Sequence, residues 1–184
     1  MILAGMPPLT VENYRLLPET GPRYQLIEGD LYMAPAPNRF HQEISRNLEL
    51  ILGNYLTQNP LGKVYHAPFD VYLDDTNVFQ PDILYVSKSR FHILTLDGAE
   101  GAPDFIVEIL SPRTAKLDLL NKRRQFARHG VDELWIIDPA NRTLSVYRFA
   151  ENAEEPVMII PESGQVCTPH FPGLLIEMAQ VFAE

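Results

Sequence analysis

The stretch Pro103-Asp104-Phe105-Ile106-Val107-Glu108-Ile109-Leu110 decides how this chain folds. Residues 105–110 are almost continuously apolar and rich in β-branched side chains, which is typical of a strand that is covered on both faces. The one carboxylate inside the strand, Glu108, is costly to bury unless a partner satisfies it. The stretch therefore predicts a central strand that carries a buried acidic group.

A second strand-like run, residues 78–86, precedes the first and contains Asp82 directly after Pro81. Proline inside such a run indicates a sheet edge or a bulge. Asp82 and Glu108 are 26 residues apart, so their carboxylates would converge at one edge if the two strands are neighbours. The alternative for Asp82 is a simple turn residue at the edge of the sheet.

A basic helix is predicted directly after the central strand, beginning at Ser111-Pro112 and ending at Gly130. Serine suits the cap, proline the first turn and glycine the position after the last turn. The net charge of −9 argues against a polyanionic ligand, because phosphate binding draws on positive surface. However, residues 111–130 carry six basic side chains against one aspartate, a local balance of +5, and the remainder holds −14. An ordinary solvated helix face is the alternative interpretation of this basic helix.

Two carboxylates near a lysine are the minimum equipment for Mg²⁺-assisted hydrolysis of a phosphodiester. The candidate metal ligands are Asp82, Glu108 and the backbone carbonyl of Ile109, because a hard cation takes oxygen ligands. Lys122 is the first choice for the cation that stabilises charge on phosphorus or orients the attacking water, and Lys116 is the second.

Each of these polar residues also has a simpler interpretation. Lys122 lies four residues after Asp118, so an ordinary pair on the helix surface is the alternative for it. Glu28 is a candidate third carboxylate of the metal shell, or merely a polar residue before a turn. His41 lies near the start of a predicted helix, where it would contact a phosphate or help to cap the helix.

Several other classes of protein are excluded by the sequence. It contains no Walker-type loop, no strand-linked G-x-G-x-x-G, no H-E-x-x-H and no G-x-S-x-G motif. Cys167 is the only cysteine, so no internal disulfide and no cysteine-rich zinc site can form. No apolar run approaches the length that spans a bilayer, and the start of the chain lacks the features of a signal peptide. A cytoplasmic location without a membrane partner is therefore expected.

The length of 184 residues and the 46% of apolar residues predict one globular domain, residues 1–184. The order of elements predicts a mixed α+β sheet with helices on its faces and additional antiparallel strands. Besides the elements above, the sequence predicts helices at 10–17 and 41–55, a hairpin at 24–33, strands at 64–73, 134–137, 143–149 and 156–160, a loop or short helix at 91–102, and a terminal helix at 174–182.

Several short motifs follow one another at suitable spacing and together resemble the Uma2 (DUF820) family. They are Tyr24-Gln25-Leu26-Ile27-Glu28-Gly29-Asp30, Ala34-Pro35-Ala36-Pro37, Gln80-Pro81-Asp82-Ile83-Leu84, Val107-Glu108-Ile109-Leu110-Ser111-Pro112 and Glu133-Leu134-Trp135-Ile136-Ile137-Asp138-Pro139. The resemblance runs from about Thr10 to the C-terminus. The family is similar to the PD-(D/E)XK nucleases, the superfamily of many restriction endonucleases, which implies a core sheet of four or five strands flanked by helices.

By this resemblance, Pro81-Asp82 supplies the aspartate of the PD motif and Glu108 the second acid. The chain departs from the standard pattern at Leu110, which stands where the lysine is expected. The resemblance moves that lysine to the following helix, at Lys122. Glu28 matches an acidic residue that joins the metal shell in some relatives, and the implied cofactor is Mg²⁺, with Mn²⁺ as the substitute.

The leading hypothesis is a Mg²⁺-dependent endonuclease that acts on nucleic acid, with DNA as the expected substrate. A homodimer is expected, because cutting two antiparallel strands suits two-fold symmetry. The departure at Leu110 and the net acidity favour an alternative, a catalytically inactive module of the same fold that binds nucleic acid or a protein partner. A third hypothesis is an unrelated structural protein whose buried acids satisfy polar groups of the core.

Overall fold

The computed structural model describes residues 7–18, 20–34, 36–111 and 116–184, with residues 116–118 by backbone alone. Six described strands form the larger of two mixed sheets, in which β8 and β9 are parallel and all other neighbours antiparallel. Their order is β11 (Met158–Pro161), β10 (Thr143–Arg148), β9 (Glu133–Asp138), β8 (Phe105–Ile109), β6 (Ile83–Ser87) and β3 (Gly62–His66).

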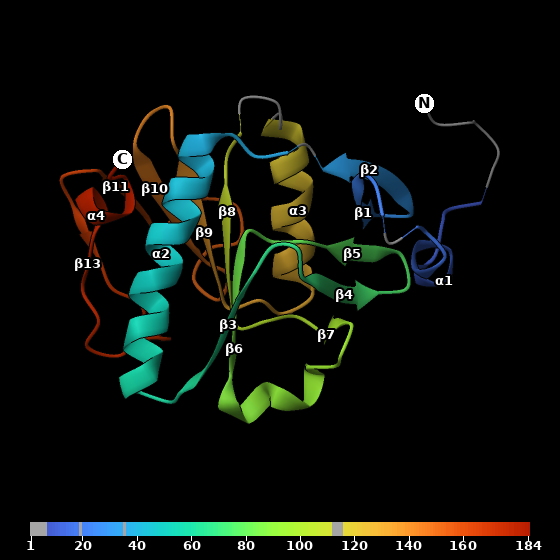
Figure 1. The fold of residues 1–184 in the computed structure, drawn as a ribbon, viewed down its shortest axis with the longest axis horizontal. Coiled ribbons are helices and arrows are strands. Elements are labelled where there is room, and N and C mark those ends of the chain that lie inside the picture. Colours follow the sequence, from blue (N-terminus) through green and yellow to red (C-terminus); the bar gives the residue numbers. More distant parts are fainter. Residues whose placement is uncertain (1–6, 19, 35, 112–115) are drawn as a thin grey trace.

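The smaller sheet lies beside the larger one (Figure 1). Its described strands are β2 (Asp30–Ala34), β1 (Arg23–Ile27), β5 (Asn77–Phe79), β4 (Asp70–Asp74) and β7 (Gly98–Glu100), in that order. The remaining elements are α1 (Val11–Arg15), α2 (Arg39–Gln58), a 3₁₀ helix η1 (Lys88–Ile93), α3 (Lys116–Arg128), α4 (Met178–Val181) and the paired strands β12 (Gln165–Val166) and β13 (Ile176–Glu177). The predicted α+β class is confirmed, whereas a single domain stays a prediction.

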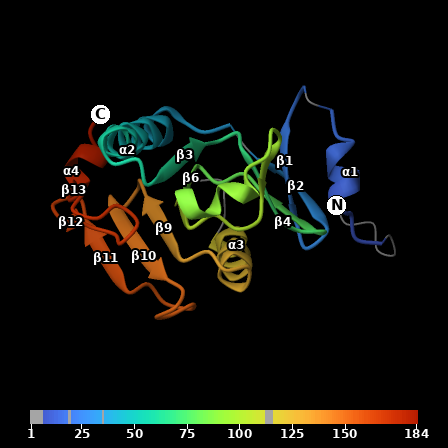
Figure 2. The same cartoon turned by 90° about the horizontal axis from the view of Figure 1, so that it is seen from below.

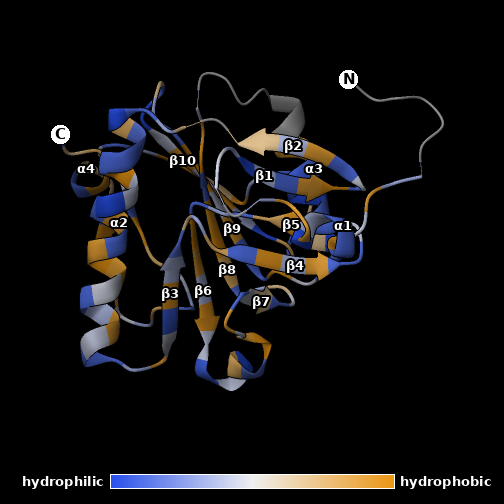
Figure 3. Cartoon of the chain, turned by 45° about the vertical axis from the view of Figure 1, so that its right-hand side comes forward, coloured by the Kyte–Doolittle hydropathy of each residue, from blue (hydrophilic) through white to orange (hydrophobic). Residues whose placement is uncertain are grey.

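The predicted central strand is confirmed as β8, which lies between β6 and β9 and is buried at every residue. Phe105, Val107 and Ile109 belong to the core under α2, and Ile106 to the core on the α3 side. Because side chains alternate along a strand, Glu108 shares the face of Ile106. Figure 2 shows α2 and α3 on opposite faces of the larger sheet, and Figure 3 shows β6 and β8 hydrophobic along most of their length.

The amphipathic helix predicted at 41–55 is confirmed as α2. The side chain of Asn38 accepts the backbone N–H of His41 at 2.9 Å and so caps the first turn. Ile44, Leu48 and Leu52 follow at spacings of four residues and are fully buried against the larger sheet. No helix in the described ranges is long and apolar enough to cross a membrane.

The strands predicted at 64–73 and 78–86 are wrong as single elements, because each run breaks into two strands that belong to different sheets. The first break follows His66, where Pro68 lacks the N–H that a ladder requires, and the second spans residues 80–82 around Pro81. The chain crosses between the sheets at both breaks. Asp82 therefore lies in a crossover directly before β6 and not inside a strand.

Two further predictions need correction. The terminal helix predicted at 174–182 is reduced to α4, because Ile176 pairs with Val166 as β13 before the helix begins. Within residues 91–102, β7 pairs in parallel with β4, a contact that no local pattern indicated. The predicted helix start at Ser111-Pro112 lies at residues 112–115, outside the described ranges.

Leu48→Ala should lower the free energy of unfolding by roughly 2–5 kcal/mol, because Leu48 is fully buried between α2 and the larger sheet. Leu50→Ala, on the exposed side of the same helix, is the matched control and should change stability by less than about 0.5 kcal/mol. Urea unfolding followed by circular dichroism measures both. Equal losses in the two variants would contradict the assignment of the buried face.

Candidate functional site

Asp82 is held at the end of the central strand by backbone donors. The backbone N–H of Ile109, the last residue of β8, donates to Asp82 Oδ2 at 2.7 Å. The backbone carbonyl of Asp82 accepts from the N–H of Ala67 at 3.1 Å, so the two crossovers between the sheets are joined at this point. The neighbouring strands β6 and β8, paired at Ile83 and Val107, thus bring Asp82 and Glu108 to the same end of two interior strands of the larger sheet.

Glu108 and Lys122 form a buried ion pair between β8 and α3. The Lys122 Nζ lies 3.3 Å from Glu108 Oε1 and 3.2 Å from Oε2, and the two side chains are 8% and 9% exposed. Desolvation of two charges largely offsets their attraction, so such a pair adds little net stability compared with apolar residues. A lysine and a carboxylate buried together at a strand end are therefore better explained by chemistry than by stability.

His41 reaches the same strand ends from the first turn of α2, which lies on the other face of the sheet from α3. Its Nε2 lies 3.3 Å from Asp82 Oδ2, and its side chain is 9% exposed. Burial alone would lower the pKa of His41. The hydrogen bond and charge of Asp82, the charge of Glu108 and the backbone of Ile109 outweigh burial, and the pKa of His41 is raised above its ordinary value. One imidazole thus interacts with all three groups that the sequence offered as metal ligands.

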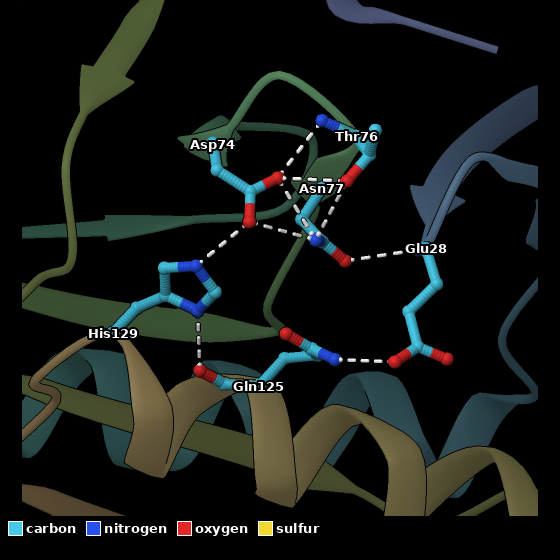
Figure 4. Close-up of polar contacts among 6 residues, drawn as sticks. All are labelled: Glu28, Asp74, Thr76, Asn77, Gln125 and His129. Atoms are coloured by element: carbon cyan, nitrogen blue, oxygen red, sulfur yellow. Dashed lines mark hydrogen bonds and ion pairs between the residues drawn. The ribbon is translucent and has the colours of Figure 1, made fainter. Parts of the chain in front are cut away.

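The remaining candidates lie differently. Glu28, in the turn between β1 and β2, is exposed and accepts a hydrogen bond from Gln125 Nε2 at 2.9 Å (Figure 4). It therefore contacts α3 one turn beyond Lys122, on the side of the smaller sheet. Lys116 is the first residue of α3, but its side chain lies outside the described part of the structure, as does that of Asp118.

Two buried glutamines beside the site were not among the residues predicted from the sequence. Gln25, on β1, accepts the backbone N–H of Gln80 at 3.3 Å, and so anchors the segment that leads into Asp82. Gln125, on α3, binds Glu28 and is 5% exposed. The sequence signal for both was a polar residue within an apolar strand or helix face. Only the tertiary structure shows which group each glutamine binds.

The donor set fits a hard divalent cation. Two carboxylates and a backbone carbonyl are all oxygen ligands, and Mg²⁺ is commonly held by one or two carboxylates while waters complete its shell. Within the described residues, no three His, Cys, Asp or Glu side chains gather closely enough to hold a metal ion. Asp82 and Glu108 would therefore supply two positions, with the carbonyl of Ile109 and water supplying the others.

The two mixed sheets with helices on the faces of the larger one define an α+β protein with a nuclease-like fold. Residues 11–179 match the model of the Uma2 family, described as "Putative restriction endonuclease", and the chain belongs to this family. A solved structure from Anabaena variabilis ATCC 29413, described as a "putative nuclease belonging to DUF820", superposes with a TM-score of 0.81. It is 23% identical, and the match covers 96% of this chain and 98% of that one. No curated protein matches this chain.

Lys122→Met should lower the free energy of unfolding of the metal-free protein by roughly 3–5 kcal/mol, because it removes the ammonium that lies 3.2 Å from the buried Glu108 carboxylate. Adding Glu108→Gln should recover much of the loss, since a neutral amide requires no cation. Chemical denaturation in the presence of EDTA measures both variants. Wild-type stability of the single variant would contradict a buried ion pair.

The raised pKa of His41 predicts a pH dependence of stability in the metal-free protein. Because the folded state holds this proton more tightly, the contribution is fully present below the unfolded value of 6.5 and is lost as the pH rises through the folded-state pKa. His41→Gln should remove this decline above pH 6.5, while His92→Gln on the exposed 3₁₀ helix should retain it. Denaturation at a series of pH values measures the slope, and equal slopes for wild type and His41→Gln would contradict the prediction.

Proposed function

We propose that this chain is a divalent-metal-dependent endonuclease that hydrolyses phosphodiester bonds of nucleic acid, with Asp82, Glu108 and Lys122 as its catalytic residues. The observation that carries the proposal is the buried Glu108–Lys122 pair at the strand end where Asp82 is fixed. The departure from the standard motif at Leu110 is compensated in space, because α3 brings Lys122 to the carboxylate that the missing lysine would accompany.

Asp82, Glu108 and the carbonyl of Ile109 would hold Mg²⁺, or Mn²⁺ in its place. When bound, the cation supplies a water-derived nucleophile at neutral pH and neutralises charge on the phosphate. Lys122 donates hydrogen bonds to the phosphoryl oxygens as negative charge develops on them. Asp82 is oriented for its role by the N–H of Ile109 and by His41.

The charge distribution supports an anionic substrate at this site despite the acidic total. Residues 111–130 carry the local excess of +5, and this segment begins directly after the strand that bears Glu108. DNA is the substrate that we propose, and a homodimer is the expected assembly, because cleavage of both strands of a duplex suits two-fold symmetry. The cytoplasmic location stays a prediction.

A catalytically inactive module of the same fold is the alternative, favoured by Leu110 in the motif position and by the net charge of −9. Metal binding discriminates between the two functions, because only the nuclease requires a cation at Asp82 and Glu108. Binding of nucleic acid alone does not discriminate, since both functions include it.

Titration calorimetry with Mg²⁺ and Mn²⁺ should detect binding to wild-type protein and none to Asp82→Asn/Glu108→Gln. A nicking assay on duplex DNA should show that Asp82→Asn cleaves on the order of 100-fold or more slowly. The matched control, Glu12→Gln/Asp97→Asn, removes two carboxylates at exposed positions and should behave as wild type. Cleavage by Asp82→Asn at the wild-type rate would contradict the assignment. A wild-type protein that binds neither cation and cleaves no DNA would favour the inactive module.

A further inference from the structure

A closed ring of polar contacts joins the end of α3 to two turns of the smaller sheet (Figure 4). Gln125 Nε2 donates to Glu28 Oε1 at 2.9 Å, and the backbone N–H of Glu28 donates to Asn77 Oδ1 at 3.0 Å. Asn77 Nδ2 donates to both oxygens of Asp74, whose Oδ2 lies 2.8 Å from His129 Nε2. His129 Nδ1 lies 2.8 Å from the backbone carbonyl of Gln125 and closes the ring. These five residues are called the α3 clamp.

Both ring nitrogens of His129 face oxygens that can only accept. One partner is the carbonyl of Gln125 and the other is the carboxylate of Asp74. A neutral imidazole carries a single N–H, so it would leave one nitrogen lone pair against an acceptor at 2.8 Å. Both acceptors are satisfied only by a ring in which both nitrogens carry a proton. The position directly after the last residue of α3 suits a cation, because the free carbonyls of a helix end carry negative charge.

Asp74 is arranged to remain ionised. Its Oδ1 accepts from the backbone N–H and the hydroxyl of Thr76 at 2.8 and 3.0 Å, in addition to Asn77. Burial tends to raise the pKa of Asp74, but hydrogen bonds from Thr76, Asn77 and His129 outweigh burial and lower it. Asp74 faces His129 directly from the β4 end, and Glu28 faces it through Gln125 from the β1–β2 turn. His129 is therefore held between a fixed anion and the carbonyl end of its own helix.

The clamp lies on the helix face that carries Lys122. Residues 122, 125 and 129 are separated by three and four positions, so their side chains project from one side of α3. Phe126, between them, contacts Phe79 of β5 with ring centres 5.0 Å apart. The clamp thus fixes the rotation of α3 about its axis and its position along the sheet, and both determine where the Lys122 ammonium lies relative to Glu108.

The two-residue turn between β1 and β2 has the positive φ values that such a tight hairpin requires at Glu28 and Gly29, and it is tied to the clamp. Glu28 has a φ of +52°, in the left-handed region of backbone conformation that residues other than glycine rarely adopt. Such a conformation persists where surrounding contacts over-determine it. Here the N–H of Glu28 is bound by Asn77 and its carboxylate by Gln125, while the N–H of Gly29 donates to the carbonyl of Thr76 at 3.0 Å. The turn thereby holds the Glu28 carboxylate toward α3.

We propose that the α3 clamp positions Lys122 in the nuclease centre. The ring of contacts is complete only when both ring nitrogens of His129 carry a proton. With His129 charged, α3 is seated so that Lys122 meets Glu108. Loss of the proton sets a nitrogen lone pair against an oxygen and releases the end of the helix. The effect on cleavage rests on the proposed function, whereas the protonation of His129 and the seating of α3 do not.

The protonation of His129 is tested by two-bond ¹H–¹⁵N correlation spectra of histidine-labelled wild-type protein at pH 7. The two ring nitrogens of His129 should both show the chemical shifts of protonated imidazolium. His92, exposed on η1, provides the reference for a histidine outside the clamp. A single neutral tautomer for His129 at this pH would overturn the proposal.

Variants test the positioning role. His129→Gln should speed amide hydrogen exchange along α3 by on the order of tenfold, and should lower kcat about 10- to 100-fold with little change in KM. His129→Arg keeps a permanent cation with several donors, and should restore both quantities and remove their decline at high pH. His92→Gln is the matched control and should leave exchange and kcat unchanged.

The outcomes separate the clamp from the nuclease. If wild-type protein cleaves no nucleic acid, the proposed function is contradicted, and the imidazolium signature with the exchange rates still decides on the clamp. If wild type cleaves, but His129→Gln retains wild-type exchange and kcat, the clamp is overturned while the nuclease stands. A purely structural role would lower stability in both substituted variants without the pH-independent rescue by arginine.

Discussion

The buried pair of Glu108 and Lys122 is the constraint on which the rest of the structure depends. Each charge costs several kcal/mol to remove from water, so the fold must place the carboxylate and the ammonium within hydrogen-bonding distance of each other. This placement requires that β8 lies at the centre of a sheet and that α3 packs against the face to which Glu108 points. The apolar central strands and the helix on either face of the larger sheet meet this requirement.

The two breaks in the extended runs place Asp82 beside this pair. At Pro68 and Pro81 the chain leaves one sheet for the other, and the two crossovers are joined by the hydrogen bond from Ala67 to the carbonyl of Asp82. An aspartate inside a strand would point to one face only, but in a crossover its carboxylate can accept the N–H of Ile109. The break in the extended run therefore places the Asp82 carboxylate against the end of β8.

One helix connects the two sheets and the site. Lys122 faces the larger sheet, while Gln125 and His129 contact the turns of the smaller one. On another side, the buried Arg123 binds Glu154 at 2.7 Å and lies over the ring of Tyr147. The described part of α3 is therefore fixed on several sides, by contacts with both sheets.

The sequence by itself determined the buried strand with its acid, the amphipathic helix, the basic helix and the family, because these are encoded by local periodicity, helix signals and short motifs. Only the tertiary structure decided which polar groups meet. His41 contacts Asp82 and Gln125 contacts Glu28, the latter across 97 residues of sequence. Such pairs depend on how strands cross between the sheets and how a helix is rotated, and hydrophobic patterning within a short window records neither.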